Sequence, residues 1–380
     1  MQILGIFNVF YTYYAKITSF PFIIQLCIIF ILGCFIAFSI FLAALSYIRY
    51  LFNKKVRKEN KLSPVIDELL VKFLFDEESK YSEFEIYNEF TSKIGKLSKS
   101  NLNLITDRFI KCKNSFNFKS DQRFLTIINA IGLEKHIDNK LDFSSAFNKM
   151  KGIQELSNLS ISTSESKIIP YTYSGNNQLK KEARNSYVRL SKNDPFKYFE
   201  DSNEQLNEWD QINLLKNLMN IENTIVPNFS KWIAYSKNDS IISFSLKMCA
   251  FFKQQESIPT IIEFLKTENH NLRAEAFKTL GELGAGEYEN MMKEMYPNQP
   301  ENCQKEIIRS IGKFNSGLSL DFLSAQYSLS NETDTKKVIA ESILNYENKG
   351  NETFSILMNS EKDFSRLILQ HIANPLIKFK

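Results

Sequence analysis

The longest apolar run in the chain lies near its N-terminus. No charged residue occurs between Lys16 and Arg49, and the segment from Phe22 to Tyr47 is built mostly of Ile, Leu, Phe and Ala. A helix needs about 20 such residues to cross the hydrocarbon of a bilayer, at about 1.5 Å of rise per residue. A cleaved signal peptide has a shorter apolar region, of about 7–15 residues. The pattern therefore predicts a single transmembrane helix over residues 20–50.

Basic residues follow this run and are scarce before it. Lys16 is the only charged residue on its N-terminal side. Because cytoplasmic flanks of membrane helices are enriched in Lys and Arg, we expect the N-terminus outside and everything after the helix in the cytoplasm. The residues that set this topology are Arg49, Lys54, Lys55, Arg57, Lys58 and Lys61.

Two short segments flank the predicted helix. Residues 51–61 form a basic juxtamembrane linker. Residues 1–19 are rich in Phe and Tyr, which are favoured at the interface between membrane and water. We expect them to form a short interfacial segment that either lies on the outer surface or packs on a membrane partner.

The second half of the chain repeats with a fixed period, which is typical of solenoids. An asparagine recurs every 31 residues, and two columns four residues apart are small or apolar throughout, as expected for one face of a helix. The asparagines are Asn176, Asn207, Asn238 and Asn269. The first column is Ala183, Leu214, Ser245, Ala276 and Ile307, and the second is Tyr187, Leu218, Cys249, Leu280 and Ile311.

A proline also recurs, at Pro195, Pro227 and Pro259, each before an apolar run. Proline is well tolerated in the first turn of a helix, and asparagine is a good N-cap because its side-chain oxygen accepts an unpaired backbone N–H. Each unit is therefore predicted to hold two short antiparallel helices. About six units fit between 176 and 380.

The sequence NHNLRAEAFKTLGELG, residues 269–284, resembles the first helix of a HEAT repeat. Leu272, Arg273, Ala276, Leu280 and Gly281 stand where that family carries such residues, and NCQKEIIRSIG, from 302, is similar. The resemblance covers about half the chain and weakens upstream, where Asp210 stands in place of Leu272. It implies an all-α fold, in which the transmembrane helix is followed by an α-solenoid of HEAT-like helix pairs over residues 176–380.

Residues 62–175 are also expected to be helical, as divergent units. Ser63 and Pro64 have the residue types of an N-cap and a first helical position. The Ser- and Thr-rich stretch 158–177 is the candidate internal boundary. An apolar stripe follows Pro64 at helical spacing, made of Val65, Ile66, Leu69, Leu70, Phe73 and Leu74.

The sequence carries no recognisable catalytic, cofactor or metal motif. Its three His and five Cys lack metal-ligand spacing, and no CxxC, P-loop, G-x-G-x-x-G or G-x-S-x-G is present. Cys249 lies in a core column and is expected to be a small buried hydrophobe. The net charge is +4, but the basic cluster alone carries +5 and Lys16 a further +1, so the remaining body is near neutral at −2 and a nucleic-acid partner is not expected for it. We therefore predict no catalytic, cofactor or metal site and no enzyme activity.

Aromatic residues are the candidates for a partner-binding surface, because Trp and Tyr anchor many interfaces. Trp232 aligns with Phe264 in a second-helix column and is expected in the core. Trp209 has no aromatic counterpart in the neighbouring units and is the stronger surface candidate. The full set is Trp209, Tyr235, Tyr288, Tyr296 and Tyr327.

Together these features favour a non-catalytic, membrane-tethered scaffold that presents a cytoplasmic solenoid to protein partners, themselves membrane-associated. An alternative is a dedicated accessory subunit of a membrane enzyme or export complex, for example an envelope glycosyltransferase, docked through the Gly33 and Cys34 face of its membrane helix. A HEAT-like enzyme is a third possibility. The Lys-, Asn-, Ile- and Phe-rich composition resembles that of AT-rich bacterial genomes and suggests a bacterial inner or plasma membrane.

Overall fold

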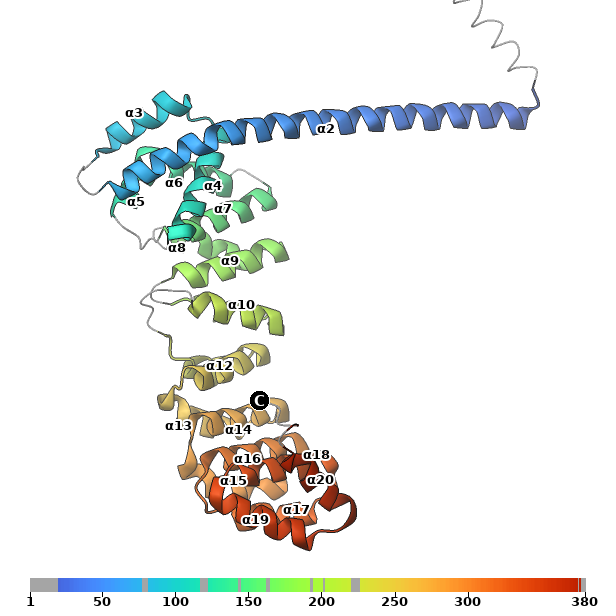
Figure 1. The fold of residues 1–380 in the computed structure, drawn as a ribbon, viewed down its shortest axis with the longest axis vertical. Coiled ribbons are helices and arrows are strands. Elements are labelled where there is room, and N and C mark those ends of the chain that lie inside the picture. The colour runs from blue at the N-terminus through green and yellow to red at the C-terminus, as the bar shows by residue number, and fades with distance from the viewer. Residues whose placement is uncertain are drawn as a thin grey trace, which may run out of the picture. The chain divides into compact units, whose positions relative to one another are not determined.

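The fold is described from a computed structural model, which covers residues 20–76, 81–116, 122–142, 145–161, 165–191, 194–200, 202–219, 226–374 and 376. All regular elements in these residues are helices. The predicted interfacial segment, residues 1–19, lies outside the described residues. The chain divides into two compact units, Met1–Asp138 and Asn139–Lys380 (Figure 1).

The first unit is built around one very long helix, α2. The predicted N-cap at Ser63 and helix start at Pro64 are wrong, because α2 passes through both without interruption. Pro64 removes one backbone hydrogen bond, but it lies on an exposed side of the helix, where water can hydrate the freed carbonyl. The helices are α2 Phe22–Phe75, α3 Glu83–Ile94, α4 Lys99–Phe116, α5 Gln122–Ala130 and α6 Leu133–Asp142, which crosses the division between units.

The last turns of α2 form the core of this unit against α3, α4 and α5. The predicted apolar stripe is confirmed, since all of its members except the half-buried Val65 are buried. The rim is held by charge-assisted contacts: Arg108 Nε donates to Asp67 Oδ1 at 2.7 Å, and Lys72 Nζ lies 2.7 Å from Glu89 Oε2. The C-terminal end of α2 is therefore fixed to the folded unit.

The second unit consists of short α-helices and of shorter 3-10 helices, labelled η, which follow one another along the chain. Its elements are α7 Ala146–Leu159, α8 Glu165–Ile168, η2 Ile169–Tyr173, α9 Asn177–Leu190, η3 Lys197–Phe199, α10 Glu208–Met219, α11 Ser230–Tyr235, α12 Asp239–Phe251, η4 Gln255–Ser257, α13 Ile258–Phe264, α14 His270–Leu283, η5 Gly286–Tyr288, α15 Glu289–Met295, η6 Tyr296–Asn298, α16 Glu301–Phe314, α17 Leu320–Leu329, α18 Thr333–Leu344, α19 Glu347–Ser360 and α20 Asp363–Ala373.

All four repeated asparagines accept a backbone N–H at the start of a helix, as predicted. Asn176 Oδ1 accepts from Leu179 N at 3.0 Å, and Asn207 Oδ1 accepts from Asp210 N at 2.8 Å. Asn238 and Asn269 make the equivalent bonds before α12 and α14. The caps are local interactions, which explains why their positions could be found from sequence.

The repeated prolines follow the prediction less well. Pro259 lies in the first turn of α13 as expected. Pro195 instead precedes the short helix η3, and Pro227 lies three residues ahead of α11. There Asn228 Oδ1 accepts from Ser230 N at 2.9 Å and takes over the start of the helix. Of the three prolines, Pro259 alone therefore lies in the first turn of a second helix, as predicted.

The first helices of the repeats, α9, α10, α12, α14, α16, α18 and α20, follow one another through the second unit (Figure 1). Contacts join α9 to α10, and they join α12, α14, α16, α18 and α20 in succession. Both predicted core columns are buried along their whole length, Cys249 included. Burial raises the pKa of the Cys249 thiol to about 11, which fits an inert core residue.

The second unit begins earlier than the boundary expected at 175. Helix α7 and the turn η2 both pack on α9. The hydroxyl of Tyr171 also donates to the carbonyl of Leu141 at 2.9 Å, within the same unit. Helices α7, α8 and η2 therefore belong with α9 to the second unit.

Two glycines allow neighbouring first helices to approach closely. A Cβ atom added to Gly281 would lie 2.8 Å from Ser310 Cα, and one added to Gly312 would lie 2.7 Å from Ser342 Cβ. Ser310 Oγ uses this proximity to donate to the carbonyl of Phe277 at 2.8 Å. Only glycine fits at these contacts, since backbone atoms stand where a side chain would go.

We expect Gly281→Ala to destabilise the second unit by about 1–3 kcal/mol through overpacking. At an exposed position of a helix, the same change would raise the free energy of unfolding by about 1 kcal/mol. The sign of the measured change therefore shows whether position 281 is closely packed. The measurement is urea unfolding of the full chain in detergent, with Gly175→Ala as the control because its added methyl group meets no atom within 4 Å. An unchanged or raised midpoint for Gly281→Ala would contradict this close packing.

Candidate functional site

The apolar part of α2 is exposed apart from the half-buried Gln25 and Ile28. Its most apolar stretch has a mean hydropathy of 2.9 and no buried residue, and the helix is long and apolar enough to cross a membrane. A helix suits this environment because it pairs its own backbone groups. Exposed apolar side chains continue past Tyr47, through Ile48 and Tyr50 to Phe52. This surface has no covering element within the described part of the chain.

The predicted topology residues lie on the same helix directly after this surface. All six are exposed: Arg49, Lys54, Lys55, Arg57, Lys58 and Lys61. Lys58 Nζ donates to Ser100 Oγ at 3.0 Å, and Lys55 forms an exposed ion pair with Glu59 at 3.6 Å. Exposed pairs of this kind contribute little to stability. The cluster therefore presents positive charge to its surroundings.

The predicted aromatic surface divides into exposed and buried residues. Trp209 is 69% exposed and Tyr235 is 82% exposed, while Tyr288 is half-buried. Trp232 lies in the core, as predicted.

The prediction is wrong for Tyr296 and Tyr327, which are both buried. The Tyr296 ring packs edge-on against Phe322, with ring centroids 5.4 Å apart. The Tyr327 hydroxyl donates to the carbonyl of Ser365 at 2.6 Å. Both therefore act in packing rather than on a surface.

Trp209 belongs to an exposed apolar stripe on α10. Ile212 and Met219 share its face, at helical positions i+3 and i+10, and each has more than half of its area exposed. Lys216 lies between them on the same face and is also exposed. The opposite face of α10 buries Leu214 and Leu218. The helix is thus anchored on one side and open on the other.

Lys216 also begins a column of basic residues that the sequence analysis missed. Its equivalents, 31 residues apart in successive first helices, are Lys247 on α12, Lys278 on α14 and Arg309 on α16. The column could have been found by extending the repeat register to polar positions. Counting charge over the whole body obscured it, since acidic residues elsewhere balance these cations.

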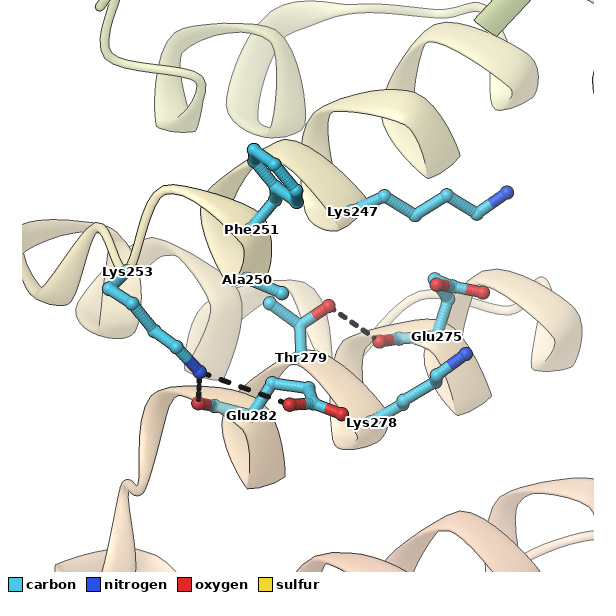
Figure 2. A pocket seen from close by; sticks show the side chains of 8 residues that line it. All are labelled: Lys247, Ala250, Phe251, Lys253, Glu275, Lys278, Thr279 and Glu282. Atoms are coloured by element: carbon cyan, nitrogen blue, oxygen red, sulfur yellow. Dashed lines mark hydrogen bonds and ion pairs between the residues drawn. The ribbon is translucent and has the colours of Figure 1, made fainter. Parts of the chain in front are cut away.

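A surface pocket of about 400 Å³ lies between α12 and α14, beside this column. Figure 2 shows Phe251 and Lys247 on α12, with Thr279, Glu275 and Lys278 on α14 below them. Its floor is held by the Thr279 hydroxyl, which donates to the carbonyl of Glu275 at 2.8 Å. The lining is Lys247, Ala250, Phe251, Lys253, Glu275, Lys278, Thr279 and Glu282.

The charges around this pocket are unevenly compensated. Glu282 is held by Lys313, and the bond from Lys313 lowers the pKa of the Glu282 carboxyl. Lys247 Nζ donates only to the neutral Gln211, at 3.0 Å. Lys216 and Lys278 form no ion pair with any described residue. Lys278 nevertheless lies close enough to Glu282 to help lower the pKa of that carboxyl, so Lys216 and Lys247 are the cations of the column that keep their charge without a carboxylate partner among the described residues.

No catalytic or metal-binding arrangement is apparent in these residues. Among the residues that the structure describes, no group of three His, Cys, Asp or Glu could hold a metal ion. A second hollow on α3 contains Glu85 and Glu89, but Glu85 caps its own helix through Ser82 and Glu89 pairs with Lys72. Both carboxylates thus have structural roles.

Comparisons with known proteins add little to this picture. No family model and no curated protein matches the chain. Among solved structures it is similar to the crystal structure of an engineered protein from a structural genomics programme, at 13% identity and a TM-score of 0.29. That match covers 80% of this chain and 87% of the engineered chain. A TM-score this low carries no argument about fold or function.

Proposed function

We propose that this chain is a non-catalytic, membrane-tethered scaffold, whose helical units bind protein partners beside the membrane. One observation carries the proposal above all others. Helix α2 is continuous from the exposed apolar surface, which begins at Phe22, to the buried residues between Ile66 and Leu74. A single element therefore connects a membrane-compatible surface directly to a folded core.

The membrane arrangement is part of the same proposal. The exposed apolar surface supports a single pass, and the basic cluster after it supports an outer N-terminus and a cytoplasmic body. We assign the chain to a bacterial inner or plasma membrane on composition.

The proposal predicts that a green fluorescent protein fused to the C-terminus of the full chain is fluorescent in bacterial cells. Alkaline phosphatase fused at the same position should be inactive, because it matures only after export. The positive-inside rule is the physical reason. Active phosphatase with a dark fluorescent fusion would reverse the topology.

We also propose that the second unit is a HEAT-like α-solenoid. The in-register N-caps, the two buried columns and the close glycine–serine contacts between successive first helices support this reading. Stacked helix pairs form extended surfaces that suit protein binding. Tethering raises the effective concentration of such a surface for a membrane-bound partner.

The alternative is an accessory subunit that docks on a membrane enzyme or export complex through α2 itself. One observation favours it: a Cβ atom added to Gly33 would meet no atom within 4 Å, and the neighbouring Cys34 is exposed. A partner helix could therefore approach α2 closely along this face.

The two functions can be separated by replacing residues 22–47 with a leucine–alanine run of the same length. Full-length wild-type and replaced chains are purified in mild detergent from the native host, and their stoichiometric partners are compared. If the chain is a scaffold, the partner should stay bound to both chains, because α2 then acts only as a tether. Loss of the partner from the replaced chain would favour the accessory subunit. Absence of any partner from both would contradict the two functions together.

A further inference from the structure

We propose that the exposed face of α10, α12 and α14 binds an acidic amphipathic helix of a protein partner. The binding face consists of the α10 apolar stripe together with the basic column and Phe251. The inference rests on the proposed scaffold function and adds the surface and the chemistry of its partner. All of these residues belong to the second unit.

The apolar end of the binding face lies on α10. Trp209, Ile212 and Met219 present an apolar stripe on that helix, interrupted by Lys216, and Phe251, half exposed on α12, adds an aromatic ring at the pocket. Large side chains grouped on one exposed face favour burial by a partner. A partner segment therefore needs apolar residues at this end.

The cationic part of the binding face is regular. Lys216, Lys247 and Lys278 occupy one position in three successive first helices, and none of the three forms an ion pair with a described carboxylate, although Lys278 helps to lower the pKa of Glu282 on its own helix. Such cations favour an anionic partner and disfavour a basic one. Arg309 extends the column, but Glu306 already pairs with it on the same helix.

The spacing of the column selects a helix over an extended segment. Helices α12 and α14 pack on each other, and packed helices lie about 8–10 Å apart, so Lys247 and Lys278 have roughly that separation. Residues seven apart in a helix share a face and are separated by about 10.5 Å along it. In a strand, residues on one face repeat every 6.6 Å or so, and those three apart point to opposite faces. A partner helix with an acidic residue at every seventh position can therefore place one carboxylate opposite each cation.

The local carboxylates favour a protein partner over an anionic membrane surface. Glu275 lines the pocket between the helices that carry Lys247 and Lys278, and Glu282 lies one turn beyond Lys278. A flat array of lipid phosphates would be repelled at Glu275, while Lys313 and Lys253 already offset the charge of Glu282. A protein helix can place acidic side chains opposite the lysines and uncharged ones opposite the glutamates, which also fixes its register.

The test uses the full chain in nanodiscs of zwitterionic lipid. The probe is a synthetic helix with Glu at every seventh position and Leu at the adjacent face, compared with a scrambled peptide of the same composition. We expect the ordered probe to bind and to shift the fluorescence of Trp209, which is exposed, while Trp232 is buried and insensitive. Equal binding of the scrambled probe would overturn the proposal.

Charge reversal makes the test specific. Lys247→Glu with Lys278→Glu should weaken binding of the probe by about tenfold or more, since two attractions become repulsions. A probe with Lys in place of Glu should bind the reversed variant. The control, Lys237→Glu with Lys266→Glu, has the same charge but changes exposed residues outside the binding face, and should bind like the wild type. Unaltered binding to the reversed variant would overturn the proposal.

Two further outcomes are decisive. Vesicles containing phosphatidylserine are tested by flotation with the same variants. If charge reversal abolishes vesicle binding but not probe binding, the face is a membrane contact and the proposal fails. If the native partner of the scaffold stays bound to the reversed variant, this inference fails while the scaffold function stands. Loss of the native partner from the chain in which residues 22–47 are replaced would count against the scaffold function and not against this inference.

Discussion

Replacing Leu32, Phe35 and Phe38 together by arginine is expected to release the chain from membranes. Each arginine near the centre of a membrane helix costs about 2.5–3.5 kcal/mol, and each lost Leu or Phe removes a further 0.3–0.6 kcal/mol or so. The total of about 8–12 kcal/mol matches or exceeds what the apolar run contributes by the same measure. The substitutions also leave no uninterrupted apolar segment long enough to span the hydrocarbon.

The measurement is alkaline carbonate extraction of membranes, followed by detection of the chain in the pellet and supernatant. The matched control carries three arginines after the apolar surface, as Asn53→Arg, Asn60→Arg and Ser63→Arg. These positions lie on the same helix but within or after the basic cluster, so the control should stay in the pellet. A triple variant that also resists extraction would show that another part of the chain holds it to the membrane.

Phe196→Ala is expected to destabilise the second unit by about 3–5 kcal/mol, as for large-to-small changes in a packed core. Phe196 is fully buried and sits at the centre of an aromatic cluster. Its ring centroid lies 4.9 Å from Phe199, 5.5 Å from Phe229, 5.7 Å from Phe244 and 5.8 Å from Trp232. Truncation leaves a cavity among rigid rings that cannot close around it.

The cluster contains its own reporter, since Trp232 and Trp209 are the two tryptophans of the chain. In a Trp209→Phe background, the emission of Trp232 follows denaturant unfolding of this region. Phe251→Ala is the control, because half of that ring is exposed, and it should cost at most about 1 kcal/mol. If both alanine variants unfold at the same denaturant concentration, the cluster is not a stabilising core.

Local and periodic features could be predicted from the sequence, and features that depend on distant packing could not. The asparagine caps and buried columns recur at fixed positions, so a feature found in one repeat supports the same assignment in the next. Pro64 was misread because a local rule indicates a helix start, whereas the residues before it also favour helix and extend α2.

The candidate partner-binding residues show the same division. Trp209 was identified because no other unit carries an aromatic residue there. Tyr296 and Tyr327 were misassigned because their burial depends on contacts with residues of later helices, such as Phe322 and Ser365. The basic column is visible in the register, but charge had to be read position by position rather than as a sum.

The continuity of α2 has a geometric consequence for the proposed tether. Ile66, the first buried residue of the helix, lies about 25 Å along it from Arg49, at about 1.5 Å per residue. A flexible linker would let the first unit sample many heights and orientations above the bilayer. A continuous helix instead fixes the height and the orientation of the unit together. Each added or deleted residue would shift the unit by about 1.5 Å and turn it by about 100°. The length of this stalk thus sets both the reach and the facing direction of the first unit.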